Sequence, residues 1–396
     1  MIKLLLALVL CFECSATTYY VATNGNNSND GLTPDTAFGI DIFYSIGAGT
    51  NTFIVLSGTY QTNVIIRKSN TTIRSQVKWG ARIVGTSAVA SPGISIWPAP
   101  IDHCTVDGFE VANAGIMGIA YYGSNMVIRN CWVHDSGQSH GVNAGSGIIS
   151  VNGSGSTSYF NELIEMNLLE NNGFSLGFDH GIYGAGSNSV IRGNVCRGNR
   201  GFGISVFSND GSGQNNNLVY NNLCYRNYGD SLLTGYQLGF NSLNVAGTTN
   251  YAFGNTLITT NGRALFCEWT TLLATNNIII STNNGIVTYS PSGTVSWTFG
   301  DYNLAPRALS AAGPHDVISS AYGFVNPANG LYWLTGTSTA RCRAWPGEFG
   351  PVDFFGTPQT NVCDVGAFQY QPAYATDVRV LDPSSYCGAD YWAILY

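Results

Sequence analysis

Short hydrophobic runs alternate with polar turns through the middle of the chain. From about residue 101 to residue 290, each β-branched run is followed by Asn, by two or three apolar or Cys residues, and by a turn that closes on Gly. Runs this short are typical of strands and leave no room for a helix in each repeat. Aligned on Asn, the copies are Val127–Asn130, Ile164–Asn167, Ile191–Asn194, Val219–Asn222, Ala252–Asn255 and Ala274–Asn277.

The spacing of these copies predicts how the strands are arranged. The aligned Asn residues are 37, 27, 28, 33 and 22 residues apart. Periods in this range, built from several short strands, predict a parallel β-solenoid in which each repeat forms one rung. Rungs about 4.8 Å apart bring equivalent side chains into columns, so we expect the Asn residues to form an amide ladder. Asn172, Asn199 and Asn227 predict a second ladder.

Composition supports this fold and excludes two classes of protein. Charged residues make up 10 % of the chain, against roughly 25 % in an average domain, and the formal net charge is -7. We therefore expect neither a nucleic-acid-binding protein nor a solvated helical bundle. Gly contributes 48 residues and Asn 39, and both favour turns over helix interiors. A hydrophobic content of 44 % is sufficient for a large core.

The N-terminus predicts export from the cell. Lys3 supplies a positive charge, residues 4–12 form an apolar segment, and residues 14–16 form a small-residue cleavage site, as in a signal peptide that covers residues 1–16. The apolar segment is too short to cross a bilayer, and no later run of about 20 apolar residues follows it. The sequence therefore predicts a secreted or cell-surface protein without a membrane span.

Eight cysteines remain after removal of this segment, and an even number suits an oxidising compartment. One pair is 27 residues apart and another is 28 apart, each about one rung, which favours either two disulfides or two pairs of stacked buried thiols. A third pair brackets a loop with Gly and Pro near the C-terminus and predicts a further bridge. The candidate cysteines, in these pairs, are Cys104 and Cys131, Cys196 and Cys224, and Cys342 and Cys363.

Segments near both ends carry a family resemblance. Residues 19–34 and 53–60, with Phe53-Ile54-Val55-Leu56 followed by Ser-Gly-Thr-Tyr, resemble the opening of secreted right-handed parallel β-helix proteins of the pectate-lyase-like superfamily. Residues 353–358 and 364–370 are similar to the segment that closes many of their coils. The resemblance implies an all-β, single-stranded right-handed parallel β-helix with an N-terminal cap and an irregular C-terminal segment. It leaves the activity open, because that superfamily includes lyases, hydrolases, epimerases and non-catalytic surface proteins.

The resulting division of the chain has four parts. Residues 17–300 form the β-helix with its cap, residues 301–370 form the C-terminal end of the same domain, and residues 371–396 form a tail that we expect to dock on it. The signal peptide, residues 1–16, precedes them.

The sharpest candidate for chemistry is the pair Asp179 and His180, within a rung. A neutral imidazole beside a carboxylate can remove a proton from a sugar carbon, and Asp179 can either orient that imidazole or bind calcium. Tyr183 is a candidate proton donor. The alternative is structural: a turn Asp that caps backbone amides and a His that fills space.

Arginines provide the second candidate feature. Between Val190 and Tyr228 there are four Arg and one acid, a local excess of +3. Guanidinium groups recognise carboxylates and would neutralise a uronate, which favours an acidic polysaccharide as partner. The alternative is solvated side chains at rung corners. The candidates are Arg197, Arg200 and Arg226, with Arg263 in the column of His180, and with His140, whose Ser-His-Gly resembles the Gly-His-Gly of polygalacturonases without their paired aspartates.

These features predict a carbohydrate-active enzyme that acts on an acidic extracellular polysaccharide by C5 proton abstraction, as lyases or epimerases do. No cofactor is expected other than calcium. Two alternatives stay open: a non-catalytic structural or glycan-binding β-helix protein, and a glycoside hydrolase.

Overall fold

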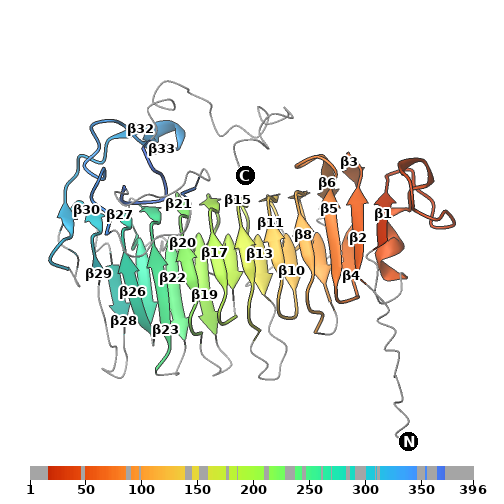
Figure 1. Cartoon of the computed structure of the whole chain (residues 1–396), viewed down its shortest axis with the longest axis horizontal. Coiled ribbons are helices and arrows are strands. Elements are labelled where there is room, and N and C mark those ends of the chain that lie inside the picture. Colours follow the sequence, from red (N-terminus) through yellow and green to blue (C-terminus); the bar gives the residue numbers. More distant parts are fainter. Residues whose placement is uncertain are drawn as a thin grey trace, which may run out of the picture.

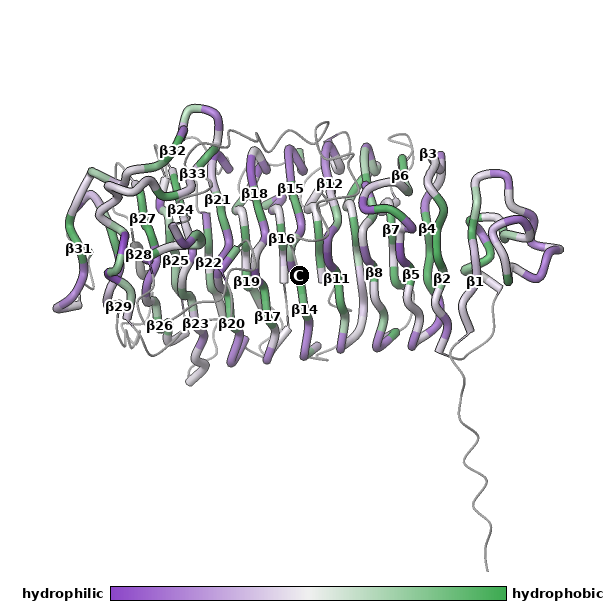
Figure 2. Tube along the Cα trace, turned by 45° about the horizontal axis from the view of Figure 1, so that its top comes forward, coloured by the Kyte–Doolittle hydropathy of each residue, from purple (hydrophilic) through white to green (hydrophobic). Residues whose placement is uncertain are grey.

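The strands of the chain wind into a parallel β-helix with three long faces (Figure 1). Sequence runs of two to five residues become strands, and polar turns connect them, so that Figure 2 shows hydrophobic strands interrupted by hydrophilic turns at the edges. The computed structural model describes residues 17–45, 50–85, 91–97, 100–138, 145–150, 159–174, 178–184, 186–208, 214–227, 237–242, 247–259, 262–268, 270–281, 286–289, 300–307, 309, 313–345, 353–354 and 364–370.

From β2 to β28, each rung contributes one strand to each of three parallel sheets, which confirms the predicted solenoid. Sheet A contains β1 (Thr17–Val21), β2 (Asn51–Val55), β5 (Thr71–Ser75), β8 (Thr105–Asp107), β11 (Val127–Arg129), β14 (Leu163–Glu165), β17 (Val190–Arg192), β20 (Leu218–Tyr220), β23 (Thr249–Phe253), β26 (Thr271–Thr275) and β29 (Gly300–Asp301). Sheet B contains β3 (Gly58–Tyr60), β6 (Ala81–Val84), β9 (Glu110–Ala112), β12 (Trp132–His134), β15 (Leu168–Glu170), β18 (Val195–Arg197), β21 (Leu223–Tyr225), β24 (Thr256–Ile258), β27 (Ile278–Ile280), β30 (Leu304–Ala305) and β31 (Val317–Ile318). Sheet C contains β4 (Val64–Ile66), β7 (Ile94–Ile96), β10 (Ile119–Tyr121), β13 (Ile148–Ser150), β16 (Ile182–Gly184), β19 (Ile204–Ser208), β22 (Leu238–Ser242), β25 (Leu265–Glu268) and β28 (Ile286–Tyr289).

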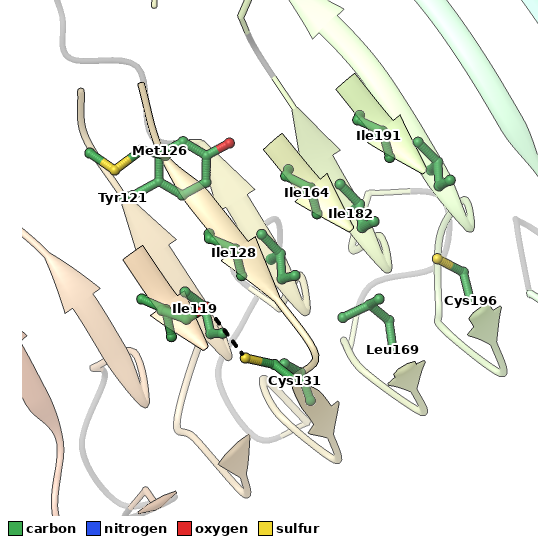
Figure 3. Close-up of a cluster of buried hydrophobic side chains, with 14 of the residues drawn as sticks. Ile119, Tyr121, Met126, Ile128, Cys131, Ile164, Leu169, Ile182, Ile191 and Cys196 are labelled. Carbon is green, nitrogen blue, oxygen red and sulfur yellow. Dashed lines mark hydrogen bonds between the residues drawn. The ribbon is translucent and has the colours of Figure 1, made fainter. Parts of the chain in front are cut away.

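The core is a set of inward columns. Ile128 pairs in register with Ile164, and Ile164 with Ile191, and all three are buried. Sheet C supplies the matching column that includes Ile119 and Ile182 (Figure 3). Because β-branched side chains stack well on a pleated surface, the repeated Ile and Val of the sequence fix the register. Each fully buried aliphatic side chain stabilises the fold by roughly 1.5–3 kcal/mol.

The first predicted amide ladder is confirmed from Asn167 onward. Asn194 Oδ1 accepts a hydrogen bond from the backbone N–H of Asn167 (3.0 Å), and Asn194 Nδ2 donates to Asn222 Oδ1 (3.0 Å) on the next rung. The ladder closes at Asp316, whose Oδ1 accepts from the backbone N–H of Asn303 (2.7 Å). These bonds satisfy buried backbone groups at every turn from sheet A to sheet B. Its amide members are Asn167, Asn194, Asn222, Asn255, Asn277 and Asn303.

The predicted alignment of the earliest copy is wrong by one residue. Ile128, not Val127, pairs with Ile164, so Cys131 occupies the ladder position and its backbone N–H donates to Asn167 Oδ1 (2.9 Å). Asn130 lies one position earlier, with φ 56°. Both positions of this two-residue turn suit Asn, the first because it is left-handed and the second because an amide bridges the rungs. An alignment of the repeats based on Asn alone cannot tell these two turn positions apart.

The second predicted ladder is also confirmed, at the turns from sheet B to sheet C. Asn172 Nδ2 donates to Asn199 Oδ1 (3.0 Å), and Asn199 Nδ2 donates to Asn227 Oδ1 (2.9 Å). A third pair, Asn217 and Asn250, joins rungs at the turns from sheet C to sheet A through a 3.0 Å bond from Nδ2 to Oδ1. Most Asn residues of the repeats are therefore structural.

The two disulfides considered within the repeats are absent, and the cysteines are buried free thiols. Cys196 and Cys224 are register partners inside sheet B, which matches the alternative of stacked thiols. Cys104 precedes β8 at one corner of the coil, whereas Cys131 follows β11 at another. A spacing of 27 residues does not place two side chains in one column when they lie at different corners.

Short elements flank the coil at both ends. The 3-10 helices η1 (Pro34–Thr36) and η2 (Ile40–Tyr44) follow β1. At the other end, β32 (Phe324–Asn326), η3 (Pro327–Asn329) and β33 (Leu331–Leu334) form an antiparallel hairpin. None of the described helices is long and apolar enough to cross a membrane.

The C-terminal segment covers part of the outer face of sheet B. Leu331 and Phe368 pack in one apolar cluster with Leu223 of β21, in agreement with the position of β32 and β33 beside that sheet in Figure 1. Cys342 is an exposed free thiol whose backbone N–H donates to Asp364 Oδ1 (2.8 Å). Cys363 and the tail from residue 371 lie outside the described residues, so the predicted third bridge and the docked tail stay predictions.

Candidate functional site

Asp179 and His180 lie at the end of the connection from β15 to β16, where the chain enters sheet C. Asp179 is fully buried. Its Oδ2 accepts from the backbone N–H of Phe174 (2.8 Å), and its Oδ1 accepts from that of Gly145 (2.9 Å), one rung earlier. The carboxylate therefore caps the turn, as in the structural alternative.

His180 is held as a neutral imidazole. Its side chain is almost covered, with 6 % of the residue exposed, and burial lowers its pKa to about 3. Nδ1 accepts a hydrogen bond from the backbone N–H of Phe202 (2.9 Å), which leaves the ring proton on Nε2. This geometry favours a hydrogen-bond donor over the base predicted from the sequence, because neither ring nitrogen is ready to take a proton.

Aromatic rings surround this imidazole. The ring centroids of Tyr183 and Phe202 lie 5.0 and 4.8 Å from that of His180, and Phe207 stacks on Tyr183 at 5.7 Å. The contact with Phe202 confirms that His180 and Phe202 share a column on successive rungs. Burial raises the pKa of the Tyr183 phenol, so this group stays protonated. The site thus presents uncharged donors and ring faces on sheet C.

Two of the candidate arginines lie along the edge of sheet C that carries this site, Arg200 next to it and Arg263 three rungs further along. Arg263 precedes β25 by two residues, as Phe202 precedes β19 and His180 precedes β16, so the register places it in the same column. Arg200 is exposed. A Cβ on Gly173 would lie 2.4 Å from Cβ of Asp179 and 3.2 Å from Cβ of Arg200, which places Arg200 next to the capped turn. The structure therefore brings Asp179, His180, Tyr183, Arg200 and Arg263 to one edge of sheet C.

The other arginines of this stretch point away from this site. Arg197 Nη2 lies 2.8 Å from Glu170 Oε1 on the outer face of sheet B, and Arg226 Nη2 donates to the carbonyl of Ala328 (3.2 Å). Arg192 on sheet A forms an ion pair with Glu165, with Nε 2.8 Å from Oε2. The local excess of positive charge counted along the sequence is therefore largely compensated in space.

The residues at Asp179 do not fit a calcium site. Both carboxylate oxygens already accept backbone hydrogen bonds within a fully buried turn, whereas calcium needs about six to eight oxygen ligands. Within the part of the chain that the structure describes, no three His, Cys, Asp or Glu side chains are grouped closely enough to hold a metal ion. His140 lies outside the described residues, and its predicted substrate contact stays a prediction.

Two features of this region are not predicted from the sequence. Trp97 and Tyr122 follow β7 and β10 and form a ring pair on sheet C, 5.3 Å apart. Their signal is the strict alternation of inward and outward residues after each strand, as in Ser95-Ile96-Trp97. The other is Glu162, a buried carboxyl between sheets C and A that accepts from Ser150 Oγ (3.2 Å) and Ser189 Oγ (3.3 Å).

Solved structures share this architecture. A pectate lyase, Pel9A, aligns with a TM-score of 0.58 at 15 % identity, over 90 % of this chain and 97 % of that chain. A rhamnogalacturonan lyase aligns at 0.49 with 14 % identity over 77 % and 85 %, and an alginate lyase from Paenibacillus sp. str. FPU-7 at 0.42 with 16 % identity over 69 % and 95 %.

The likeness to Pel9A confirms the predicted fold: the chain is a right-handed parallel β-helix of the kind found in pectate-lyase-like proteins. At this identity the likeness concerns the fold alone. No family model matches the chain, and no curated protein matches its sequence.

Proposed function

We propose that the protein is a secreted carbohydrate-active enzyme that binds an acidic polysaccharide along the outer face of sheet C and acts on it by C5 proton abstraction, as lyases and epimerases do. The observation that carries the proposal is the imidazole of His180, fixed in one tautomer among aromatic rings and in a column with Arg263. The fold shared with a pectate lyase supports it.

The proposed roles follow from the charge that develops during the reaction. When a solvent water molecule takes the C5 proton, negative charge moves onto the uronate carboxylate, and fixed N–H donors stabilise it there. We assign this task to Nε2 of His180 and to the guanidinium group of Arg200, whereas Arg263, three rungs further along the column, would bind the carboxylate of another uronate of the same chain. In a lyase, the phenol of Tyr183 would protonate the leaving glycosidic oxygen, a role for which its raised pKa keeps the proton in place.

A second candidate function is non-catalytic glycan binding. It is favoured by the burial of His180 and by the commitment of both Asp179 oxygens to backbone N–H groups. In this case the aromatic rings and arginines of sheet C would recognise the polymer without reacting with it. The rigid stack of rungs would then serve as a scaffold.

Incubation with alginate, pectate and glycosaminoglycans tests the proposal. A lyase produces unsaturated uronate, read by its absorbance, and an epimerase changes the NMR spectrum of the polymer. New reducing ends without unsaturation would instead indicate a hydrolase, the third possibility. Binding without any of these changes would support the non-catalytic alternative.

Variants of two residues, Tyr183 and His180, locate the chemistry. We expect Tyr183→Phe to lower kcat by roughly 100-fold or more, because it removes the hydroxyl and keeps the ring. His180→Gln keeps both an acceptor for Phe202 and a donor, so it should retain more activity than His180→Ala. His315→Gln, at an exposed His on the last rungs, is the matched control and should leave kcat unchanged. A pH profile with an inflection near the ordinary imidazole pKa would contradict the donor role of His180.

A further inference from the structure

Trp97 and Tyr122 form a second aromatic cluster on the outer face of sheet C. Trp97 is 43 % exposed, and its ring meets that of Tyr122 edge to face, 5.3 Å between centroids. Tyr122 in turn meets the ring of Tyr159 at 5.1 Å, and Tyr159 is buried. Three rings from separate turns thus support one another, and the outermost ring presents its surface to solvent.

The register places this cluster in line with the aromatic rings around His180. Ile96 pairs with Tyr121, and the residue after each points outward, so Trp97 and Tyr122 lie in one column. The backbone N–H of Tyr122 donates to the carbonyl of Ile96 (3.1 Å). Continued through β13, β16 and β19, the same column reaches Phe207, which stacks on Tyr183. Four rungs, or about 19 Å, separate Trp97 from Phe207.

The size and chemistry of the exposed ring fit a sugar better than a protein. An exposed part of one Trp offers on the order of 100 Å², whereas a stable protein interface needs about 800 Å² from each partner. The C–H face of a pyranose is comparable with one indole ring in size and lacks charge. A ring held edge to face by its neighbours also loses little conformational entropy on binding.

We propose that Trp97 and Tyr122 form a pyranose-stacking subsite, separate from the rings around His180, that engages a distant sugar unit of the same polysaccharide chain. The proposal rests on the proposed function and extends it: the protein takes long chains that follow the helix axis across four rungs. Oligosaccharides too short to span from Phe207 to Trp97 would not engage both groups of rings.

Binding of alginate and pectate oligosaccharides of defined length to wild type, Trp97→Ala and Trp345→Ala tests this subsite. The control residue Trp345 is similarly exposed, 40 %, but lies in the C-terminal segment. We expect Trp97→Ala to weaken binding of long oligosaccharides by roughly 3- to 10-fold and to leave that of di- and trisaccharides unchanged. Trp97→Phe should restore most of the loss, and Trp345→Ala should match wild type at every length.

Each other outcome counts against the subsite. If wild type binds long chains and Trp97→Ala binds them equally well, the inference is wrong and the proposed function stands. If Trp97→Ala instead changes the sedimentation coefficient of the free protein, the ring belongs to a contact between copies of the chain. If wild type binds no polysaccharide of any length, the proposed function fails and this inference fails with it.

Discussion

The outer faces of sheets A and C share the same rung spacing but differ in charge, because ionised side chains line sheet A and uncharged ones line the middle of sheet C. On sheet A, one outward column alternates basic and acidic side chains. On sheet C, the described members of the middle outward column carry no ionised group, and aromatic rings flank them. The columns read Arg74, Asp107, Arg129, Glu165 and Arg192 on sheet A, and Ser95, Ala120, Ile149, Tyr183, Ser205, Gly239 and Phe266 on sheet C.

On sheet A, the charged side chains link neighbouring rungs to one another. We assign ligand recognition to the groups on sheet C. Arg192 meets Glu165 through Nε (2.8 Å) and donates through Nη1 to the hydroxyl of Tyr220 (3.0 Å). Arg129 meets Asp107 in the same way. A guanidinium satisfied by the rungs on either side has little left to offer a polymer. The rings on sheet C pack against one another without charge, and the ring of Trp97 is also 43 % exposed, which is why we place recognition there.

The largest expected effect concerns Glu162, which lies where sheets C and A meet and has hydroxyl partners instead of a cation. Burial raises its pKa from 4.5 to about 7. Below pH 4.5 the folded and unfolded states both hold the proton. Between pH 4.5 and 7 the unfolded state releases it first, so stability falls as pH rises, by about 3 kcal/mol in total.

Urea unfolding of wild type and Glu162→Gln at about pH 4 and about pH 8 measures this effect. Gln cannot ionise, so the variant should lack this part of the pH dependence, and its advantage over wild type should appear only at the higher pH. If the free energy of unfolding changes equally with pH in the two proteins, the raised pKa of Glu162 is wrong. Glu162 would then behave like the ion-paired acids of sheet A.

A smaller effect is expected from Arg192→Leu on sheet A. The substitution leaves Glu165 nearly buried without its cation, and we expect a loss of about 1–3 kcal/mol in the free energy of unfolding. Polysaccharide binding at a temperature where the variant is folded should equal that of wild type. Weaker binding at unchanged stability would move recognition from sheet C to sheet A.

The smallest effect is expected from Arg82→Gln on sheet B. Arg82 Nε lies 2.7 Å from Glu110 Oε1, but the Arg side chain is 40 % exposed, so solvent screens the pair. His134 Nε2 also approaches the same oxygen, at 3.1 Å, and remains as a partner in the variant. We expect a change of about 0.5 kcal/mol or less. A loss comparable with that of Arg192→Leu would show that exposure does not set the strength of these ladders.

Features that depend on one rung could be predicted from the sequence. The inward Ile positions and the ladder of Asn194 and Asn222 follow from local sequence patterns that recur in every rung. Residues at equivalent positions of such a pattern lie in the same column. The slip at Asn130 shows the limit of this method. Two adjacent turn positions accept the same residue for different physical reasons, so only the hydrophobic register could have separated them.

Features that depend on contacts between two rungs could not be predicted by counting charged residues along the sequence. The acids that compensate Arg192 and Arg197 are Glu165 and Glu170, each 27 residues earlier and outside the basic window. In a coil, the electrostatic neighbour of a side chain is one turn away in sequence, so local charge density is a poor guide. The burial of His180 and its bond from Phe202 depend in the same way on the rung that follows.

The ladder also determines where the coil can end. Every Asn of the ladder accepts a hydrogen bond from the rung before it and donates one to the rung after it. Asp316 can only receive, through Oδ1 from Asn303 and through Oδ2 from the backbone N–H of Gly313 (3.0 Å). A carboxylate in this place terminates the chain of amides without leaving an idle donor, so the number of turns is limited by the chemistry of one side chain. An amide at this position would leave its N–H donors without an acceptor from the rungs, and a further strand could pair with them.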